Sequence, residues 1–410
     1  MEAVRALVEE GKGLDAAALE ALTGKPAIYH CLSRVVDRQR VLGPVEREMF
    51  TMLMRRYELF CQVRVLTHSV MSNHFHILLE VPAPPPQRGR DWSDQRLLAH
   101  LGCLYSKEKV AAVGERLAEF RARGDDGAAE ELRESYFRRM WDLSECMKGI
   151  KQGFTQWFNS THDRVGTLWE GRFKSLLAED GHAAQVLAAY IDLNPVRAGI
   201  VQDPKDYRWC GYAEALAGHR RAREGIQRVM YESGTDAAGR GGPTELLTDW
   251  KEAVGRYRQV IAQTRERDEA KQAAIPAAGG GPGAAAGRAV GGPGAVGGRA
   301  VGGPGAVGGR APGRRATASG RGATPTPGAG RTGAVGGRPG GREARRITER
   351  EAVRQRVRYF ADGLVLGSAD FVNQIFRWTR GHFGPRRKDG ARRLRGIQTD
   401  LRAMRDLQKL

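Results

Sequence analysis

Apolar and polar positions alternate in four segments of this chain, which is the pattern of β-strands covered on one side. The predicted strands are 27–36, 61–68, 71–81 and 167–177. Apolar positions recur at helical spacing in 44–60 and 142–158. The resulting order of strand, helix, strand, strand, helix, strand is typical of ferredoxin-like α+β folds. We therefore expect an antiparallel sheet with helices on one face, which leaves the other face open.

One predicted strand carries two histidines on the same face. His74 and His76 are separated by one residue, and side chains at such positions project to the same side of a strand. Imidazole is a common metal ligand, but a site needs further ligands, and isolated pairs of this kind are more often ordinary half-buried residues. His30 and His68 also fall on strand-like segments, and we expect them on a polar face or in the core.

A helix rich in alanine and leucine is predicted within 181–199, with Asp180 placed to cap its start. Tyr190 and Asn194 are one helical turn apart and therefore share a face. Pro195 disfavours helical geometry at Asn194, so Asn194 lies at or near the helix end, where its amide oxygen could point into a site. The alternative is structural, with Asn194 as a C-terminal cap and Tyr190 as a half-buried core aromatic.

Four segments, taken together and in this order, resemble a known family. They are AIYHCLSR at 27–34, VMSNHFH at 70–76, GTLWEGRFKS at 166–175 and YIDLNPVRAG at 190–199. The resemblance is to the REP-associated tyrosine transposases (RAYTs), a group of single-tyrosine HUH transposases that cut and rejoin single-stranded DNA. It covers roughly 25–218 and is interrupted by one insertion.

The resemblance implies that Tyr190 is the nucleophile and that His74, His76 and Asn194 are ligands of a divalent cation. A tyrosine hydroxyl, with a pKa near ~10, is a weak nucleophile at neutral pH and needs a cation that polarises the scissile phosphate. Imidazole and amide-oxygen ligands suit Mg²⁺ or Mn²⁺ better than structural zinc. The expected products are a 5′-phosphotyrosine link and a free 3′-hydroxyl, and rejoining would need no ATP.

Basic and aromatic side chains alternate in 148–174, a mixture that suits a groove for single-stranded DNA. Together with the resemblance, this mixture predicts DNA contacts by Trp169, Arg172, Lys174, Lys151 and Arg197. Phe154, Trp157 and Phe158 also fit the buried stripe of a helix, which is the commoner role.

Charge is distributed unevenly along the chain. The formal net charge is +19, of which 1–274 contribute +1 and the segments 275–342 and 343–410 contribute +9 each. Non-specific attraction to phosphates must therefore come mainly from the last third of the chain. The segment 275–342 has no acidic or aromatic residue and repeats an 11-residue unit, so we expect it to be disordered. It would tether the tail, bind nucleic acid diffusely, or reflect neutral repeat expansion.

These patterns predict five regions. They are an N-terminal helical extension (1–24), a transposase-like domain (25–218) with a helical insertion (82–140), a helical connector (219–274), the linker (275–342) and a basic helical module (343–410). In that module we expect helices over 346–360, 368–379 and 389–407. It would recognise DNA hairpins or duplex flanks, or be a solvated basic tail.

Three functions compete on these grounds. The first is a metal-dependent transposase that acts on hairpin or repeat DNA as a homodimer or a monomer. The second is a domesticated, catalytically inactive protein that binds hairpin DNA, and the third is an RNA-binding protein, for which aromatic residues rather than histidines are expected on the open sheet. The five cysteines have no Cys-X-X-Cys spacing and no apolar run is long enough to cross a membrane, so we expect reduced thiols and a cytoplasmic, nucleoid-associated protein.

Overall fold

The centre of the structure is one mixed sheet. The computed structural model describes residues 25–231, 249–273, 347–354, 360 and 363–404. Within them the sheet runs in the order β2, β3, β1, β4, β6, β9, β7. Its strands are β1 Ala27–Arg34, β2 Arg64–Val70, β3 His74–Val81, β4 Lys174–Ala178, β6 Val365–Gly367, β7 Arg392–Arg393 and β9 Arg402–Met404. The first four strands pair antiparallel in the ferredoxin-like order, as predicted, and β6 extends the sheet parallel to β4.

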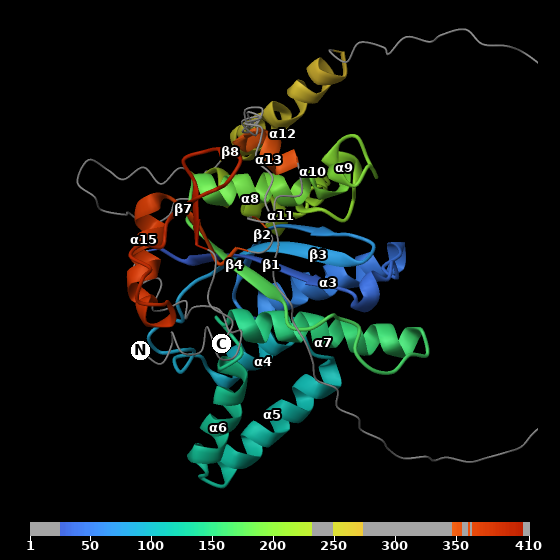
Figure 1. The fold of residues 1–410 in the computed structure, drawn as a ribbon. Coiled ribbons are helices and arrows are strands. Elements are labelled where there is room, and N and C mark those ends of the chain that lie inside the picture. Colours follow the sequence, from blue (N-terminus) through green and yellow to red (C-terminus); the bar gives the residue numbers. More distant parts are fainter. Residues whose placement is uncertain (1–24, 232–248, 274–346, 355–359, 361–362, 405–410) are drawn as a thin grey trace, which may run out of the picture. The chain divides into compact units, whose positions relative to one another are not determined.

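Helices cover both faces of this sheet (Figure 1). On one face, α3 (Pro44–Phe60) packs against α7 (Leu143–Thr161). On the other face lie α8 (His182–Asp192) and α11 (Arg220–Met230), and both contact α12 (Trp250–Ala273). The predicted α+β class is confirmed, but the second face is covered rather than open. The prediction of the layers used only the strands and helices before Ala178, and α8, α11 and α12, which cover the second face, all come later in the chain.

Alternation along β3 divides its side chains between two cores. Phe75 and Ile77 belong to the core beneath α3 and α7, whereas Leu78 belongs to the core beneath α8. Each such apolar side chain contributes roughly 1.5–3 kcal/mol when fully buried. His74 and His76 share the face of Leu78, so the strand pattern directs both histidines toward α8.

The sequence of α7 shows why this helix begins and packs where it does. Asp142 is the N-cap residue, and its side chain accepts a hydrogen bond from the backbone N–H of Glu145 (2.8 Å). Ile150, Phe154 and Phe158 then recur at one-turn intervals and are buried. The interpretation of Phe154 and Phe158 as a buried stripe is confirmed.

A buried carboxylate fixes α8 to its surroundings. Asp192 accepts hydrogen bonds from Thr67 Oγ1 of β2 (2.8 Å) and from the backbone N–H of Tyr212 (3.2 Å), which lies in α10 (Gly211–Leu216). It also accepts one from the Tyr257 hydroxyl of α12. Desolvation raises the pKa of Asp192 to about 6, although these hydrogen bonds oppose the shift. The anchor positions the residues on either side of it, including Tyr190.

Asp180 has another role than the predicted helix cap. The N-cap residue of α8 is Gly181, with a φ of 81°, a conformation that glycine adopts at little cost. Asp180 instead accepts from the Gly181 N–H (2.8 Å) and forms an ion pair with Arg228 of α11 (2.9 Å). It therefore ties the start of α8 to α11.

The segment predicted as an insertion, 82–140, is mainly helical in the structure. It contains α4 (Asp94–Leu101), α5 (Lys107–Ala122) and α6 (Asp126–Phe137). Figure 1 shows α5 and α6 side by side as a helical hairpin, and the two helices are in contact.

The C-terminal segment is less helical than predicted. It contains β5 (Ile347–Thr348), α13 (Glu349–Arg354) and α15 (Ala369–Trp378). The helix expected over 389–407 is wrong for its described part, because 389–404 hold β7, β8 (Ile397–Gln398) and β9. Gly396, at a φ of 78°, interrupts the regular spacing that suggested a helix.

Two predicted regions, the extension at 1–24 and the linker at 275–342, lie outside the described residues. Among the residues that are described, no helix is long and apolar enough to cross a membrane.

Candidate functional site

The histidine pair of β3 meets the helix that carries Tyr190. The ring centroids of His76 and Tyr190 are 6.1 Å apart, and those of His74 and His76 are 5.1 Å apart. Asn194 begins the short helix α9 (Asn194–Arg197), and its Nδ2 lies 3.4 Å from His74 Nε2. The strand pair and the helix pair are distant in sequence, yet the structure brings all four predicted residues together.

Hydrogen bonds determine which ring nitrogen of His74 and of His76 carries the proton, and His30 takes part in one of them. His30 Nδ1 lies 2.7 Å from the carbonyl oxygen of Phe360, which can only accept, so His30 carries its proton on Nδ1. Its Nε2 then accepts from His76 Nδ1, 2.9 Å away. His74 Nδ1 donates to Asn73 Oδ1 (2.7 Å). Both imidazoles therefore keep a lone pair on Nε2, with the other nitrogen held by a neighbour, as in metal-binding histidines.

Burial keeps the inner histidines neutral. Desolvation lowers the pKa of His30 to about 4, an effect that the hydrogen bond to Phe360 opposes and the charge of Arg197 reinforces. Desolvation also holds the pKa of His76 well below its ordinary value, and the neighbouring imidazoles of His30 and His74 lower it further. A neutral imidazole needs to lose no proton before it binds a metal.

Tyr190 is enclosed in this structure. Its side chain is only 2% exposed, and the ring of Phe360 packs against it at 5.1 Å between centroids. The guanidinium of Arg197 lies 4.0 Å from the Tyr190 ring centroid. Arg197 also donates to the carbonyl oxygen of Val353 (2.8 Å) and to Asn194 Oδ1 (3.2 Å). The C-terminal segment therefore covers the tyrosine.

Three side chains of this cluster could serve as metal ligands if one amide turns. Within the described residues, no group of three or more His, Cys, Asp and Glu side chains could hold a metal ion. A metal site here would consist of Nε2 of His74 and His76 together with the amide oxygen of Asn194. That oxygen now accepts from Arg197, so a half-turn of the amide is needed to direct it toward His74. With this turn, two imidazole nitrogens and one amide oxygen would face a common point and leave further coordination positions for water or phosphate.

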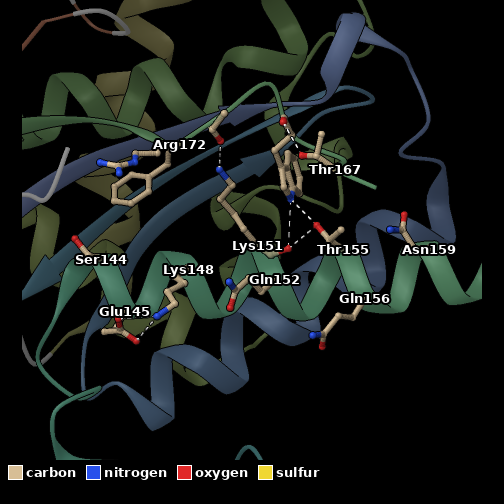
Figure 2. A pocket seen from close by; sticks show the side chains of 13 residues that line it. Ser144, Glu145, Lys148, Lys151, Gln152, Thr155, Gln156, Asn159, Thr167 and Arg172 are labelled. Carbon is tan, nitrogen blue, oxygen red and sulfur yellow. Dashed lines mark hydrogen bonds and ion pairs between the residues drawn. The ribbon is translucent and has the colours of Figure 1, made fainter. Parts of the chain in front are cut away.

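A groove with a volume of about 870 Å³ lies between α7 and the loop 167–173 (Figure 2). Lys151 Nζ donates to the Gly171 carbonyl (2.6 Å), and Trp169 Nε1 donates to Thr155 Oγ1 (3.0 Å). These bonds attach the loop to the helix. Trp169 is 5% exposed and Lys151 is 9% exposed, so both residues build the wall of the groove.

The other three predicted DNA contacts occupy different positions. Arg172 is exposed at the groove, and Lys174 is exposed at the start of β4. Lys174 pairs in register with Leu32 of β1, which in turn pairs with His76. Lys174 is thus on the sheet face of His76, two strands or about 10 Å away. Arg197 contacts Tyr190 instead of lying on an open surface.

The sequence does not reveal that His30 and Phe360 belong to the site. The sequence predicts His30 on a polar face or in the core, and its hydrogen bond to His76 depends on the register between β1 and β3. Phe360 lies in the predicted basic module (343–410), and no local sequence pattern relates it to Tyr190.

No protein-family model matches the chain, and no curated protein matches it. Among solved structures, one similar chain is described as a REP-associated tyrosine transposase bound to a REP hairpin. The TM-score is 0.31 and the sequence identity 14%, over 54% of this chain and 91% of the other. A similarity of this size supports no assignment.

Proposed function

We propose that the chain cleaves and rejoins single-stranded DNA, with Tyr190 as the nucleophile and His74, His76 and Asn194 as ligands of Mg²⁺ or Mn²⁺. The observation that carries the proposal is the convergence of these four residues, with both histidines in the tautomer that keeps a lone pair on Nε2. The sequence resemblance described above supports the same roles.

In the cleavage step, Tyr190 Oη attacks the scissile phosphorus. A bond forms between Oη and phosphorus, and the bond to the 3′ oxygen breaks. The phenol loses its proton and the departing oxygen gains one, which leaves a 5′-phosphotyrosine and a 3′-hydroxyl. The bound cation would polarise the phosphate and stabilise the charge of the transition state. Rejoining reverses the step on another 3′-hydroxyl, so no ATP is consumed.

Because Tyr190 is buried, cleavage requires a conformational change. Phe360 packs on the tyrosine ring and its carbonyl accepts from His30, so a phosphate reaches Oη only after this part of the chain moves. Arg197 must also release Asn194 Oδ1 before that oxygen can bind a cation. The structure therefore corresponds to a closed state in this proposal.

DNA would be held by exposed cations near the site. Lys174 lies on the face of His76, and Arg172 lies at the α7 groove, so both can contact phosphates. We assign Trp169 and Lys151 to the groove wall. Hairpin or repeat DNA remains the proposed substrate, because the resemblance is to enzymes that act on it.

A labelled-oligonucleotide assay tests the proposal. The full chain is incubated with 5′- and 3′-labelled single-stranded hairpins in Mg²⁺ or Mn²⁺, and covalent adducts are resolved on denaturing gels. We expect an adduct that requires the metal and is lost in Tyr190→Phe and His74→Ala. Cleavage by the Tyr190→Phe protein would contradict the assignment.

A second candidate function is hairpin DNA binding without cleavage. The burial of Tyr190 beneath Phe360 favours it, because a permanently covered phenol cannot react. Tight hairpin binding without any adduct in either metal would establish this second function.

A further inference from the structure

The turn between β2 and β3 ends at Asn73, directly before His74. The loop 35–42, which follows β1, lies against this turn. Val35 N–H donates to the carbonyl oxygen of Asn73 (2.9 Å), and Leu42 N–H donates to the carbonyl oxygen one residue earlier (2.9 Å). A distant segment of the chain therefore fixes the backbone from which His74 projects.

The loop 35–42 contains two consecutive residues in the left-handed region. Asp37 has a φ of 55° and Arg38 a φ of 56°. This conformation is uncommon for residues other than glycine, and it persists where surrounding contacts hold it. Both side chains are exposed, so packing of the side chains does not hold them. The contacts that hold this part of the loop are backbone bonds, including one from Arg38 N–H to the carbonyl oxygen of Val35 (3.1 Å).

The side-chain amide of Asn73 joins the loop to His74. Its Nδ2 donates to the carbonyl oxygen of Arg38 (2.9 Å), and its Oδ1 lies 2.7 Å from His74 Nδ1. A carbonyl oxygen can only accept, so the contact with Arg38 determines which end of the amide is the nitrogen. The end that faces His74 is therefore the oxygen, which accepts only from a protonated Nδ1.

The opposite side of the imidazole is consistent with this assignment. His74 Nε2 lies 3.4 Å from Asn194 Nδ2. The other end of that amide, Asn194 Oδ1, accepts from Arg197 (3.2 Å), so the nitrogen faces the ring. An amide nitrogen can only donate, which requires a lone pair on Nε2.

We infer that Asn73 is a positioning residue for His74 and that the left-handed turn at Asp37 and Arg38 sets its orientation. The turn directs the Arg38 carbonyl toward Asn73 Nδ2. The amide then presents Oδ1 to His74, which keeps its proton on Nδ1 and its lone pair on Nε2. The inference rests on the proposed function in one respect, that this lone pair binds the metal.

Two variants of Arg38 separate the backbone conformation from the charge. Arg38→Gly and Arg38→Val both remove the guanidinium, which is exposed. Glycine adopts a positive φ at little cost, whereas the β-branched side chain of valine opposes it. A difference between these two variants therefore reports the conformation of the turn.

Two variants of Asn73 test the hydrogen bond to His74. Asn73→Ala removes the acceptor, and without it the ring is able to carry its proton on either nitrogen. Asn73→Asp retains an oxygen opposite Nδ1 but loses the donor to Arg38. A role limited to closing the turn predicts lower stability in Asn73→Ala without a change of tautomer.

The tautomer is measured on the metal-free full chain by NMR of ¹⁵N-labelled histidine at about pH 8, where imidazoles are neutral. The nitrogen chemical shift distinguishes a protonated ring nitrogen from one with a lone pair, and His74→Gln identifies the signals of His74. Isothermal titration calorimetry measures Mn²⁺ affinity, and urea titrations show whether each variant folds.

We expect the proton on Nδ1 of His74 in the wild type, in Arg38→Gly and in Asn73→Asp. In Asn73→Ala and Arg38→Val a second population should carry it on Nε2. Mn²⁺ affinity should fall about 10-fold or more in Asn73→Ala, which is the effect of losing an outer-shell partner, and should be retained in Asn73→Asp.

A proton on Nε2 in the wild type, or an unchanged tautomer in folded Asn73→Ala, would overturn the role of Asn73. The same tautomer in Arg38→Gly and Arg38→Val would overturn the role of the turn. Absence of Mn²⁺ binding by the wild type would contradict the proposed metal site, whereas the NMR result on metal-free protein decides the positioning role independently.

Discussion

Replacing His30 by phenylalanine tests whether the hydrogen-bonded chain behind His76 prepares it to bind a metal. His30 joins the Phe360 carbonyl (2.7 Å) to His76 Nδ1 (2.9 Å), and this arrangement leaves the His76 lone pair on Nε2. Phenylalanine fills similar volume in the 2% exposed position but makes neither bond. His76 is then free to adopt the other tautomer, whose Nε2 carries a proton and cannot bind a metal.

The magnitude follows from the loss of one outer-shell partner. Such a loss typically reduces metal affinity about 10- to 100-fold, or about 1.4–2.8 kcal/mol. His30→Gln retains an acceptor near the position of Nε2, so we expect a loss of less than about 10-fold for this variant.

Mn²⁺ binding to the full chain, measured by isothermal titration calorimetry, is the assay. The chain offers a matched control in His68, which is buried in β2 and has no hydrogen-bond partner at either ring nitrogen among the described residues. His68→Phe removes a comparable buried imidazole without touching the site, so its Mn²⁺ affinity should equal that of the wild type. Thermal unfolding of both variants shows whether each one folds.

Equal Mn²⁺ affinity in folded His30→Phe and wild type would refute the role of the hydrogen-bonded chain. An equal loss of Mn²⁺ affinity in His68→Phe would show that any disturbance of the buried core weakens metal binding. This result would also refute the role of the hydrogen-bonded chain.

Three further predictions concern the packing of Phe360 on Tyr190 and the pH dependence of stability. Phe360→Ala should expose Tyr190 and raise the initial rate of adduct formation, while lowering the unfolding free energy by about 3 kcal/mol in urea titrations; a slower rate would contradict the closed-state interpretation. Folding raises the pKa of Asp192 from 3.8 to about 6, so protonation of this carboxyl stabilises the fold at low pH. The free energy of unfolding should therefore fall by roughly 3 kcal/mol as pH rises from 4 to 6. Urea titrations of Asp192→Asn should not show this fall. Burial lowers the pKa of His68 from 6.5 to about 4, so this residue destabilises the fold as pH falls from 6.5 to 4. At pH 4 the free energy of unfolding of His68→Phe should therefore be roughly 3 kcal/mol higher than that of the wild type. An unchanged pH profile would show that His68 is not buried as a neutral ring.

The strands that carry the site could be predicted because each has one apolar face. Alternation located β1 and β3 to within a few residues, and with it the common direction of His74 and His76. The helix α3 was predicted at its observed bounds, since its apolar positions recur at helical spacing between two clear strands.

What could not be predicted depends on contacts between distant segments. The burial of Tyr190 results from Phe360, and the tautomer of His76 results from the register of β1 against β3. The described part of this segment, 389–404, forms strands because β9 pairs with β6 and β7, and β8 pairs with β5, and these pairings outweigh weak local preferences. Trp169 is predicted to contact DNA, and in the structure its indole N–H donates to the Lys151 carbonyl of α7 and its ring packs in the core.

The most direct test of the central claim is to identify the residue that becomes covalently linked to DNA. The full chain is incubated with a single-stranded hairpin and Mn²⁺, digested with protease and nuclease, and analysed by tandem mass spectrometry. Our account predicts a nucleotide phosphate on Tyr190, in the peptide that contains Asn194, and no modified peptide without the metal. A phosphate on another residue, or DNA cleavage without any protein-linked nucleotide, would contradict it.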